Sequence, residues 1–167
     1  MRKIIFLDID GVLNSMEYFN QLKNAEQSKK IGEYQELDIE KVRLLAEIIA
    51  NTGAEIVLSS TWRDIGRKEG QRDHPMYQYL VYTLDAFGLK IMDHTPYLDY
   101  DRPQEIKEWL NRQEDKDIRF VSLDDDFSPE AYEKYGIGAH LVQTTFYGKN
   151  GGLQKVHVQK AINILND

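Results

Sequence analysis

Apolar runs of strand length alternate with stretches of helical periodicity along this chain. Ile4–Leu7, Ala54–Leu58 and Ile118–Leu123 are mainly apolar and contain β-branched or aromatic residues. Such runs are typical of strands buried on both faces of a sheet. Between the first two runs, apolar residues recur at helical spacing from Asp38, a good N-cap, to Gly53, where a helix can end. Alternating strands and helices predict a parallel α/β sheet.

Weaker patterns extend this alternation to the end of the chain. We expect further strands over residues 89–92 and 139–142, and helices over 75–87 and from Pro103 onward. The last segment predicts an amphipathic helix whose apolar face carries Val156, Ala161, Ile164 and Leu165. The sequence therefore predicts the α/β fold class, with a mainly parallel central sheet.

Acidic residues follow two of the predicted strands. Asp8 and Asp10 come directly after the first strand, and Gly11 allows the backbone to turn sharply there. Residues 124–126, three successive aspartates, follow the strand that ends at Leu123. Ligands bind at the carboxyl edge of open α/β sheets, and neighbouring carboxylates repel each other unless a cation lies between them. This pattern favours a cation site over a solvated acidic turn.

Four regions of the chain resemble, in order, the four sequence motifs of the haloacid dehalogenase (HAD) superfamily; the third is considered below with the basic residues. Residues 8–13, Asp-Ile-Asp-Gly-Val-Leu, resemble the first motif of its phosphatases, Asp-x-Asp-Gly-Val/Thr-Leu. The second strand, ending in Ser59, resembles the second motif, and the strand followed by Asp124-Asp125 resembles the fourth. Residues 59–63, Ser-Ser-Thr-Trp-Arg, are similar to the HAD domains of RNA-repair proteins. The resemblance implies one Rossmann-like, three-layer domain over residues 1–167.

The resemblance also implies a function and a set of site residues. The chain would be a Mg²⁺-dependent phosphomonoester hydrolase that works through an aspartyl-phosphate intermediate. Asp8 would be the nucleophile, Asp10 the general acid and base, and Ser59 a ligand of a phosphate oxygen. Asp8 and Asp10 would hold Mg²⁺ together with Asp124 and Asp125.

Basic and hydroxyl residues near these motifs are candidates for substrate binding. Ser60 either caps a helix or joins Ser59 at the phosphate, and Arg63 either binds phosphate through its planar fork or lies in solvent. The family's third motif requires a basic residue, which is Arg102 or Lys107 here. If Pro103 is the first helical residue, Arg102 occupies the N-cap, where a cation is unfavourable. Because broken local rules tend to mark function, we expect Arg102.

Composition excludes several classes of protein. The chain has 28 acidic and 21 basic residues and a net charge of −7, which does not predict an extensive duplex-binding surface. It has no cysteine, so disulfides and thiolate chemistry are excluded. No apolar run approaches the roughly 20 residues of a membrane span. The first residues lead straight into a strand instead of a signal peptide, so we expect a cytoplasmic protein without membrane contact.

Two other functions and several substrates stay open. The same acids would suit a receiver-like phospho-acceptor that binds Mg²⁺ without catalysis, or an inactive HAD-fold binding module. We expect small cap insertions at about residues 16–37 and 64–96, too short for a large cap domain. A phosphorylated substrate would then enter an open site, which favours nucleotide or nucleic-acid-end phosphates over small phosphometabolites.

Overall fold

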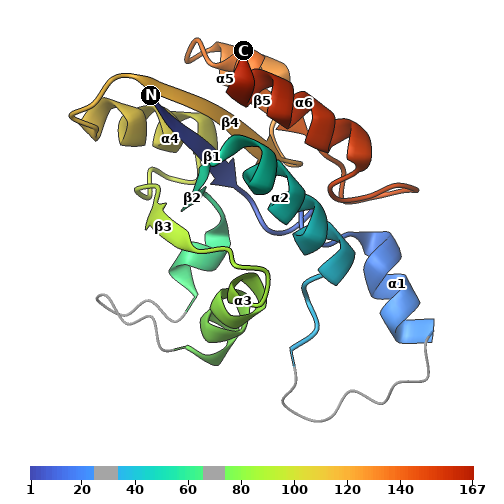
Figure 1. Ribbon diagram of the computed structural model, residues 1–167. Coiled ribbons are helices and arrows are strands. Elements are labelled where there is room, and N and C mark those ends of the chain that lie inside the picture. Colours follow the sequence, from blue (N-terminus) through green and yellow to red (C-terminus); the bar gives the residue numbers. More distant parts are fainter. Residues whose placement is uncertain (25–33, 66–73) are drawn as a thin grey trace.

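A five-stranded parallel sheet forms the centre of the protein in a computed structural model, which describes residues 1–24, 34–65 and 74–167 (Figure 1). The strands are β1 (Arg2–Leu7), β2 (Glu55–Leu58), β3 (Ile91–His94), β4 (Ile118–Asp124) and β5 (Leu141–Gln143). Their order in the sheet is β3-β2-β1-β4-β5, and every neighbouring pair is parallel. The first strand of the chain is therefore the central strand.

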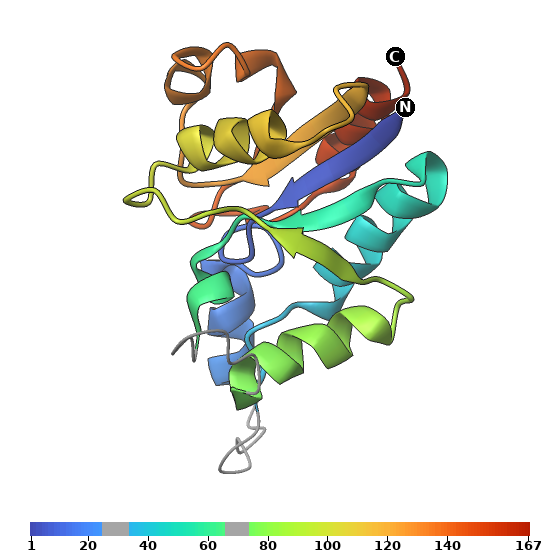
Figure 2. The same ribbon diagram turned by 90° about the vertical axis from the view of Figure 1, so that its left-hand side faces the viewer.

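Helices cover both faces of this sheet. One face carries α2 (Ile39–Thr52), α3 (Pro75–Asp85) and α6 (Lys155–Asn166), and the other carries α4 (Arg102–Arg112) and α5 (Pro129–Glu133). In Figure 1, α2 and α6 lie side by side, and Figure 2 shows α4 across the opposite face. Because both faces are covered, β1 buries Ile5 and Leu7 on one side and Ile4 and Phe6 on the other. The predicted three-layer α/β fold is confirmed.

Two of the predicted helices begin close to the expected residues. The Asp38 side chain accepts a hydrogen bond from the Glu40 amide and caps α2 as predicted. The start of α4 differs by one residue, because Asp101 is the N-cap and Arg102 is already helical. Proline is tolerated throughout a first turn, since its missing N–H has no intrahelical partner there. Pro103 therefore marked the correct turn of α4 but not its first residue.

The structure describes parts of both segments that were expected to be cap insertions, residues 16–37 and 64–96. Helix α1 (Met16–Asn24) contains no buried residue, as expected for a segment that leaves the core. The range 64–96 is not a cap as a whole, because α3 buries Tyr77, Leu80 and Leu84 in the core and β3 pairs with β2. The other parts of these expected insertions, residues 25–33 and 66–73, lie outside the described residues. Within the described ranges, no helix combines the length and apolarity needed to cross a membrane.

Candidate active site

The register of β1 and β4 brings three acids together. Leu7 pairs with Leu123, so Asp8 and Asp124, which come next on the two strands, are neighbours at the carboxyl edge. One carboxylate oxygen of each of Asp8, Asp124 and Asp125 lies within 4.8 Å of the other two. Asp8 and Asp124 are buried, and Asp125 is partly buried. Parallel pairing thus gathers acids that are far apart in the sequence.

Gly11 allows Asp125 to approach the turn after β1. Its φ angle is +78°, in the left-handed region that side chains disfavour. A Cβ atom at this position would collide with the carboxylate of Asp125. Any larger residue would therefore push Asp125 away from Asp8, so this glycine is part of the construction of the acidic site.

Arg102 at the start of α4 lies between two of these acids. Its Nη1 is 2.8 Å from Oδ2 of Asp8 and 2.8 Å from Oδ2 of Asp124. Burial opposes the charge of the guanidinium, but Asp8 and Asp124 outweigh this effect and raise the pKa of Arg102. Lys107 is exposed on the same helix. The structure therefore places Arg102, and not Lys107, at the acidic cluster.

The charge of this cluster suits a hard divalent cation. Burial raises the pKa of Asp8 to about 8, an effect that Arg102 opposes and Asp124 and Asp125 strengthen. Burial and the neighbouring Asp124 raise the pKa of Asp125 to about 6. Arg102 by itself does not offset the negative charge of three acids. Carboxylate oxygens are the ligands that Mg²⁺ prefers, so the residues present fit this ion.

We expect the metal-free protein to lose stability as the pH rises from about 4 to about 8. The ordinary pKa of an unfolded aspartate is about 4, and the folded values of Asp8 and Asp125 are higher. The folded chain therefore holds more protons in this range, and the free energy of unfolding falls with rising pH. Because Mg²⁺ would replace these protons, it should raise the Tm more at pH 8 than at pH 5.

Thermal unfolding in EDTA and in Mg²⁺ at both pH values measures this effect. Asp125→Asn, which removes the negative charge of one proposed ligand, should reduce the gain from Mg²⁺. An equal gain at pH 5 and pH 8 would contradict cation binding by these carboxylates.

Asp10 stands apart from the cluster of Asp8, Asp124 and Asp125. Its Oδ2 accepts a hydrogen bond of 3.0 Å from the Trp62 indole, and its Oδ1 accepts one of 2.9 Å from the Asn14 amide. The side-chain oxygen of Asn14, Oδ1, in turn accepts a hydrogen bond from the Gly11 N–H. The group of carboxylates close enough to share an ion does not include Asp10, so its place among the metal ligands stays a prediction. Asp10 is held as a separate carboxylate at the edge of the site.

The two serines after β2 have different surroundings. Ser59 is fully buried beside the end of β1, and its N–H donates to the Leu7 carbonyl. The Ser59 hydroxyl has no hydrogen-bond partner among the described residues. Ser60 caps the 3-10 helix of residues Thr61–Asp64 by accepting from the Trp62 N–H. Ser59 thus keeps a free hydroxyl close to Asp8, whereas the hydroxyl of Ser60 has a structural role.

Arg63 points to a different partner from the one expected. Its Nη2 is 2.8 Å from Oε1 of Glu105 on α4, and both side chains are 1% exposed. The same Glu105 oxygen accepts from the Leu98 N–H. Arg63 is not among the residues that line the pocket at Asp8. The expectation that Arg63 binds phosphate is therefore replaced by a buried ion pair that joins the 3-10 helix to α4.

A pocket of about 340 Å³ opens over the acids. Its polar lining consists of Asp8, Asp10, Thr61, Arg102, Asp125 and Asp126. Its other side is aromatic, with Phe19 from α1 and with Phe146 and Tyr147 from the loop after β5. These aromatic residues were not predicted from the sequence, because no local pattern connects α1 with the loop after β5.

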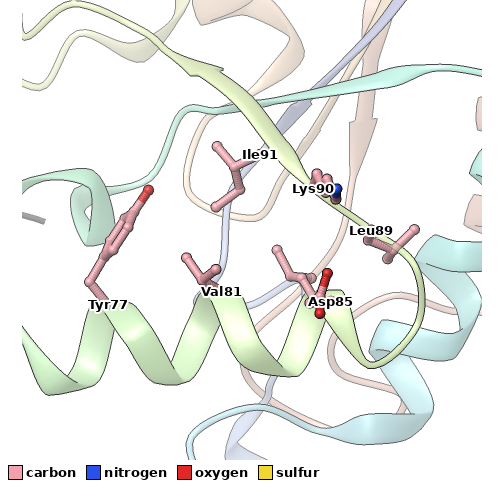
Figure 3. A pocket seen from close by; sticks show the side chains of 7 residues that line it. Tyr77, Val81, Asp85, Leu89, Lys90 and Ile91 are labelled. Carbon is pink, nitrogen blue, oxygen red and sulfur yellow. The ribbon is translucent and has the colours of Figure 1, made fainter. Parts of the chain in front are cut away.

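Another pocket lies between α3 and the β3 segment. Figure 3 shows Tyr77, Val81 and Asp85 of α3 facing Leu89, Lys90 and Ile91 across it. Its volume is about 240 Å³, and its lining is mainly apolar. None of the acids that follow β1 and β4 lines it, so the chemistry suggested by those acids belongs to the pocket at Asp8.

Comparison with known proteins supports the resemblance seen in the motifs. The sequence model of a family described as the HAD domain in Swiss Army Knife RNA repair proteins matches residues 4–158. This range includes every residue of the pocket at Asp8. Neither the curated proteins nor the solved structures gave a match.

Proposed function

Because the chain belongs to the family of HAD domains in Swiss Army Knife RNA repair proteins, we propose that it is a Mg²⁺-dependent phosphomonoester hydrolase with Asp8 as nucleophile. One observation carries the proposal. Asp8, Asp124 and Asp125 lie together, with Arg102 against the first two, while Asp10 is held separately at the same pocket. Phosphoryl transfer needs both parts, charge neutralisation at the phosphate and a group that moves a proton.

Asp8 is held in an orientation suited to attack on phosphorus. Its Oδ1 accepts a hydrogen bond from the Ile9 N–H, and its Oδ2 contacts Arg102. Mg²⁺ bound by Asp8 and Asp125, with Asp124 beside them, would neutralise the repulsion between the carboxylate and the phosphate dianion. The Arg102 guanidinium adds positive charge at the same place. Asp8 would then displace the leaving oxygen and carry the phosphoryl group as an aspartyl-phosphate.

Asp124 holds Arg102 in position beside Asp8. Its Oδ2 accepts a hydrogen bond of 3.1 Å from the Tyr132 hydroxyl and contacts Arg102, and its Oδ1 accepts from the Asp126 N–H. Both oxygens of Asp124 are therefore engaged, which fixes Arg102 beside Asp8. Asp125, whose carboxylate reaches the pocket, is the better placed of the two for direct contact with a cation.

Asp10 supplies the proton transfers. It would protonate the leaving oxygen as the phosphoenzyme forms, and then take a proton from the water that hydrolyses it. The two hydrogen bonds from Trp62 and Asn14 keep its carboxylate at the pocket edge during both steps. We propose that the buried Ser59 hydroxyl, which has no partner among the described residues, donates to a phosphate oxygen, although Ser59 is not among the residues that line the pocket. A non-catalytic phospho-acceptor has no need of a second carboxylate fixed in this way, which favours hydrolysis.

We also propose that the phosphate is carried by a nucleotide or by a nucleic-acid end. The family, which is that of HAD domains in RNA repair proteins, supports this choice. The open pocket supports it as well, because its volume of about 340 Å³ accommodates one nucleotide-sized group and leaves the remainder of a chain outside.

Turnover of phosphomonoesters tests the proposal. We expect hydrolysis of an aryl phosphate, and of 3′- or 5′-phosphorylated oligonucleotides, in Mg²⁺, and complete loss of both activities in EDTA with recovery when Mg²⁺ is restored. Phosphate release measures both. Undiminished activity in EDTA, or no release from any phosphomonoester of the panel, would remove the assignment.

A further inference from the structure

Three aromatic side chains form one side of the pocket, which we call the aromatic wall: Phe19, Phe146 and Tyr147. The ring centroids of Phe19 and Phe146 are 6.3 Å apart, and those of Phe146 and Tyr147 are 5.0 Å apart. Tyr147 is 73% exposed. The core does not account for its position, because this large ring covers little of the protein and faces a pocket that contains Asp8.

The backbone holds the aromatic wall in place. The Phe146 carbonyl accepts a hydrogen bond of 2.9 Å from the Met16 N–H at the start of α1, and the Thr145 carbonyl accepts one of 2.7 Å from the Gly152 N–H. A Cβ at Gly151 would lie 2.6 Å from Cβ of Ser15. The loop after β5 is thus packed tightly against the segment that leads into α1. A surface fixed before binding loses little entropy when a ligand docks on it.

The charges around the pocket limit what can lie against the wall. Asp8, Asp10, Asp125 and Asp126 line it, and Arg102 is the cation among its described lining residues. Even with one divalent ion bound, these groups leave no net positive charge for a second anionic substituent. A flat, uncharged aromatic group is not repelled by these acids. It loses little free energy on leaving water and can stack on the exposed ring of Tyr147.

We propose that the aromatic wall is a stacking subsite for the base of the nucleotide that carries the reacting phosphate. The inference rests on the proposed hydrolase function and adds the residues that select the substrate. A base needs no charge from the protein, which suits this acidic pocket. Sequence-tolerant stacking also suits a site that offers aromatic faces to the base. The wall therefore selects phosphates that carry a base over phosphates of the bare sugar.

Pairs of substrates that differ only in the base test the subsite. Nucleoside 5′-monophosphates are compared with ribose 5-phosphate, and nucleoside 3′-monophosphates with ribose 3-phosphate, which also shows which phosphate position is accepted. We expect kcat/KM for the accepted nucleotide to exceed that for its sugar phosphate about tenfold or more. The ratio of the two kcat/KM values is the readout.

Substitutions in the wall should change this ratio in a way that general damage would not. Tyr147→Leu and Phe19→Leu keep an apolar side chain but remove the aromatic face, and each should lower the ratio about fivefold or more, mainly through KM. Tyr147→Phe keeps the ring and should leave the ratio within about twofold of the original. Tyr82→Leu is a matched control, because Tyr82 is 70% exposed on α3 and does not line the pocket.

The outcomes separate the subsite from the hydrolase. If ribose phosphate is hydrolysed as well as the nucleotide, or if Tyr147→Leu and Phe19→Leu leave the ratio unchanged, the stacking subsite is overturned while the hydrolase proposal stands. If Mg²⁺ supports phosphate release neither from the members of these pairs nor from an aryl phosphate, the hydrolase proposal is overturned, and the subsite with it.

Discussion

Asp8→Asn is expected to lower kcat for phosphomonoester hydrolysis by at least about 10³-fold, because an amide cannot act as the nucleophile. No phosphoenzyme should form on this variant. Rapid acid quench of the reaction with a ³²P-labelled substrate measures the covalent intermediate directly. Turnover close to that of the unmodified protein would exclude covalent catalysis at Asp8.

Asp10→Asn provides the contrast that assigns the roles of the two acids. It removes proton transfer but leaves the nucleophile, so we expect phosphoenzyme to accumulate and its hydrolysis to slow by more than about 10²-fold. Formation of the intermediate should suffer less with 4-nitrophenyl phosphate than with an alkyl phosphate, because nitrophenolate leaves without protonation. Asp85→Asn is the matched control, since Asp85 is an exposed acid in the pocket between α3 and β3.

Glu105→Ala is expected to destabilise the fold by about 3–5 kcal/mol, because it removes the buried carboxylate that lies 2.8 Å from the buried guanidinium of Arg63. The Arg63 and Glu105 side chains are each 1% exposed, and the atoms that pair are 2.8 Å apart. Unfolding in urea, with the midpoint and slope compared between variants, measures the loss. Glu105 is three residues beyond Arg102 on α4, so this ion pair also helps to fix the helix turn that supplies Arg102 to Asp8.

A second ion pair on the same helix is the control for this effect. Arg112 and Glu108 pair at the same 2.8 Å, but their side chains are 60% and 38% exposed. Glu108→Ala should therefore cost no more than about 1 kcal/mol. Replacing both Arg63 and Glu105 by apolar residues of similar size should recover much of the stability that Glu105→Ala loses. Equal losses for Glu105→Ala and Glu108→Ala would show that burial does not govern the strength of the pair.

The sequence by itself determined the sheet and its acidic edge. A strand buried on both faces must be apolar along its length, so Ile4–Leu7 was recognisable without knowledge of its neighbours. The carboxyl ends of parallel strands meet at one edge, so Asp8 and Asp124 could be placed together from their position after strands. These predictions depend on local pattern and on a general rule of topology, and the structure agrees with both.

Local periodicity was less reliable for the exact position of a helix's buried face. The terminal helix was predicted to place Val156 on its apolar face, but Val156 is 71% exposed and Val158 is buried. Both residues are valine, and a short helix contains few positions from which to fix the direction of its buried face. The packing of α6 against α2 and the sheet decides which valine points inward.

Only the tertiary structure distinguished the two arginines and divided the acids. Arg63 and Arg102 have the same chemistry beside predicted motifs, but Arg63 meets Glu105 and Arg102 meets Asp8 and Asp124. Asp10 likewise differs from Asp8 because Trp62 and Asn14 hold it. The aromatic wall joins α1 to the loop after β5. Each of these facts depends on which distant side chains meet, and that is set by the packing of helices on the sheet, which no local pattern encodes.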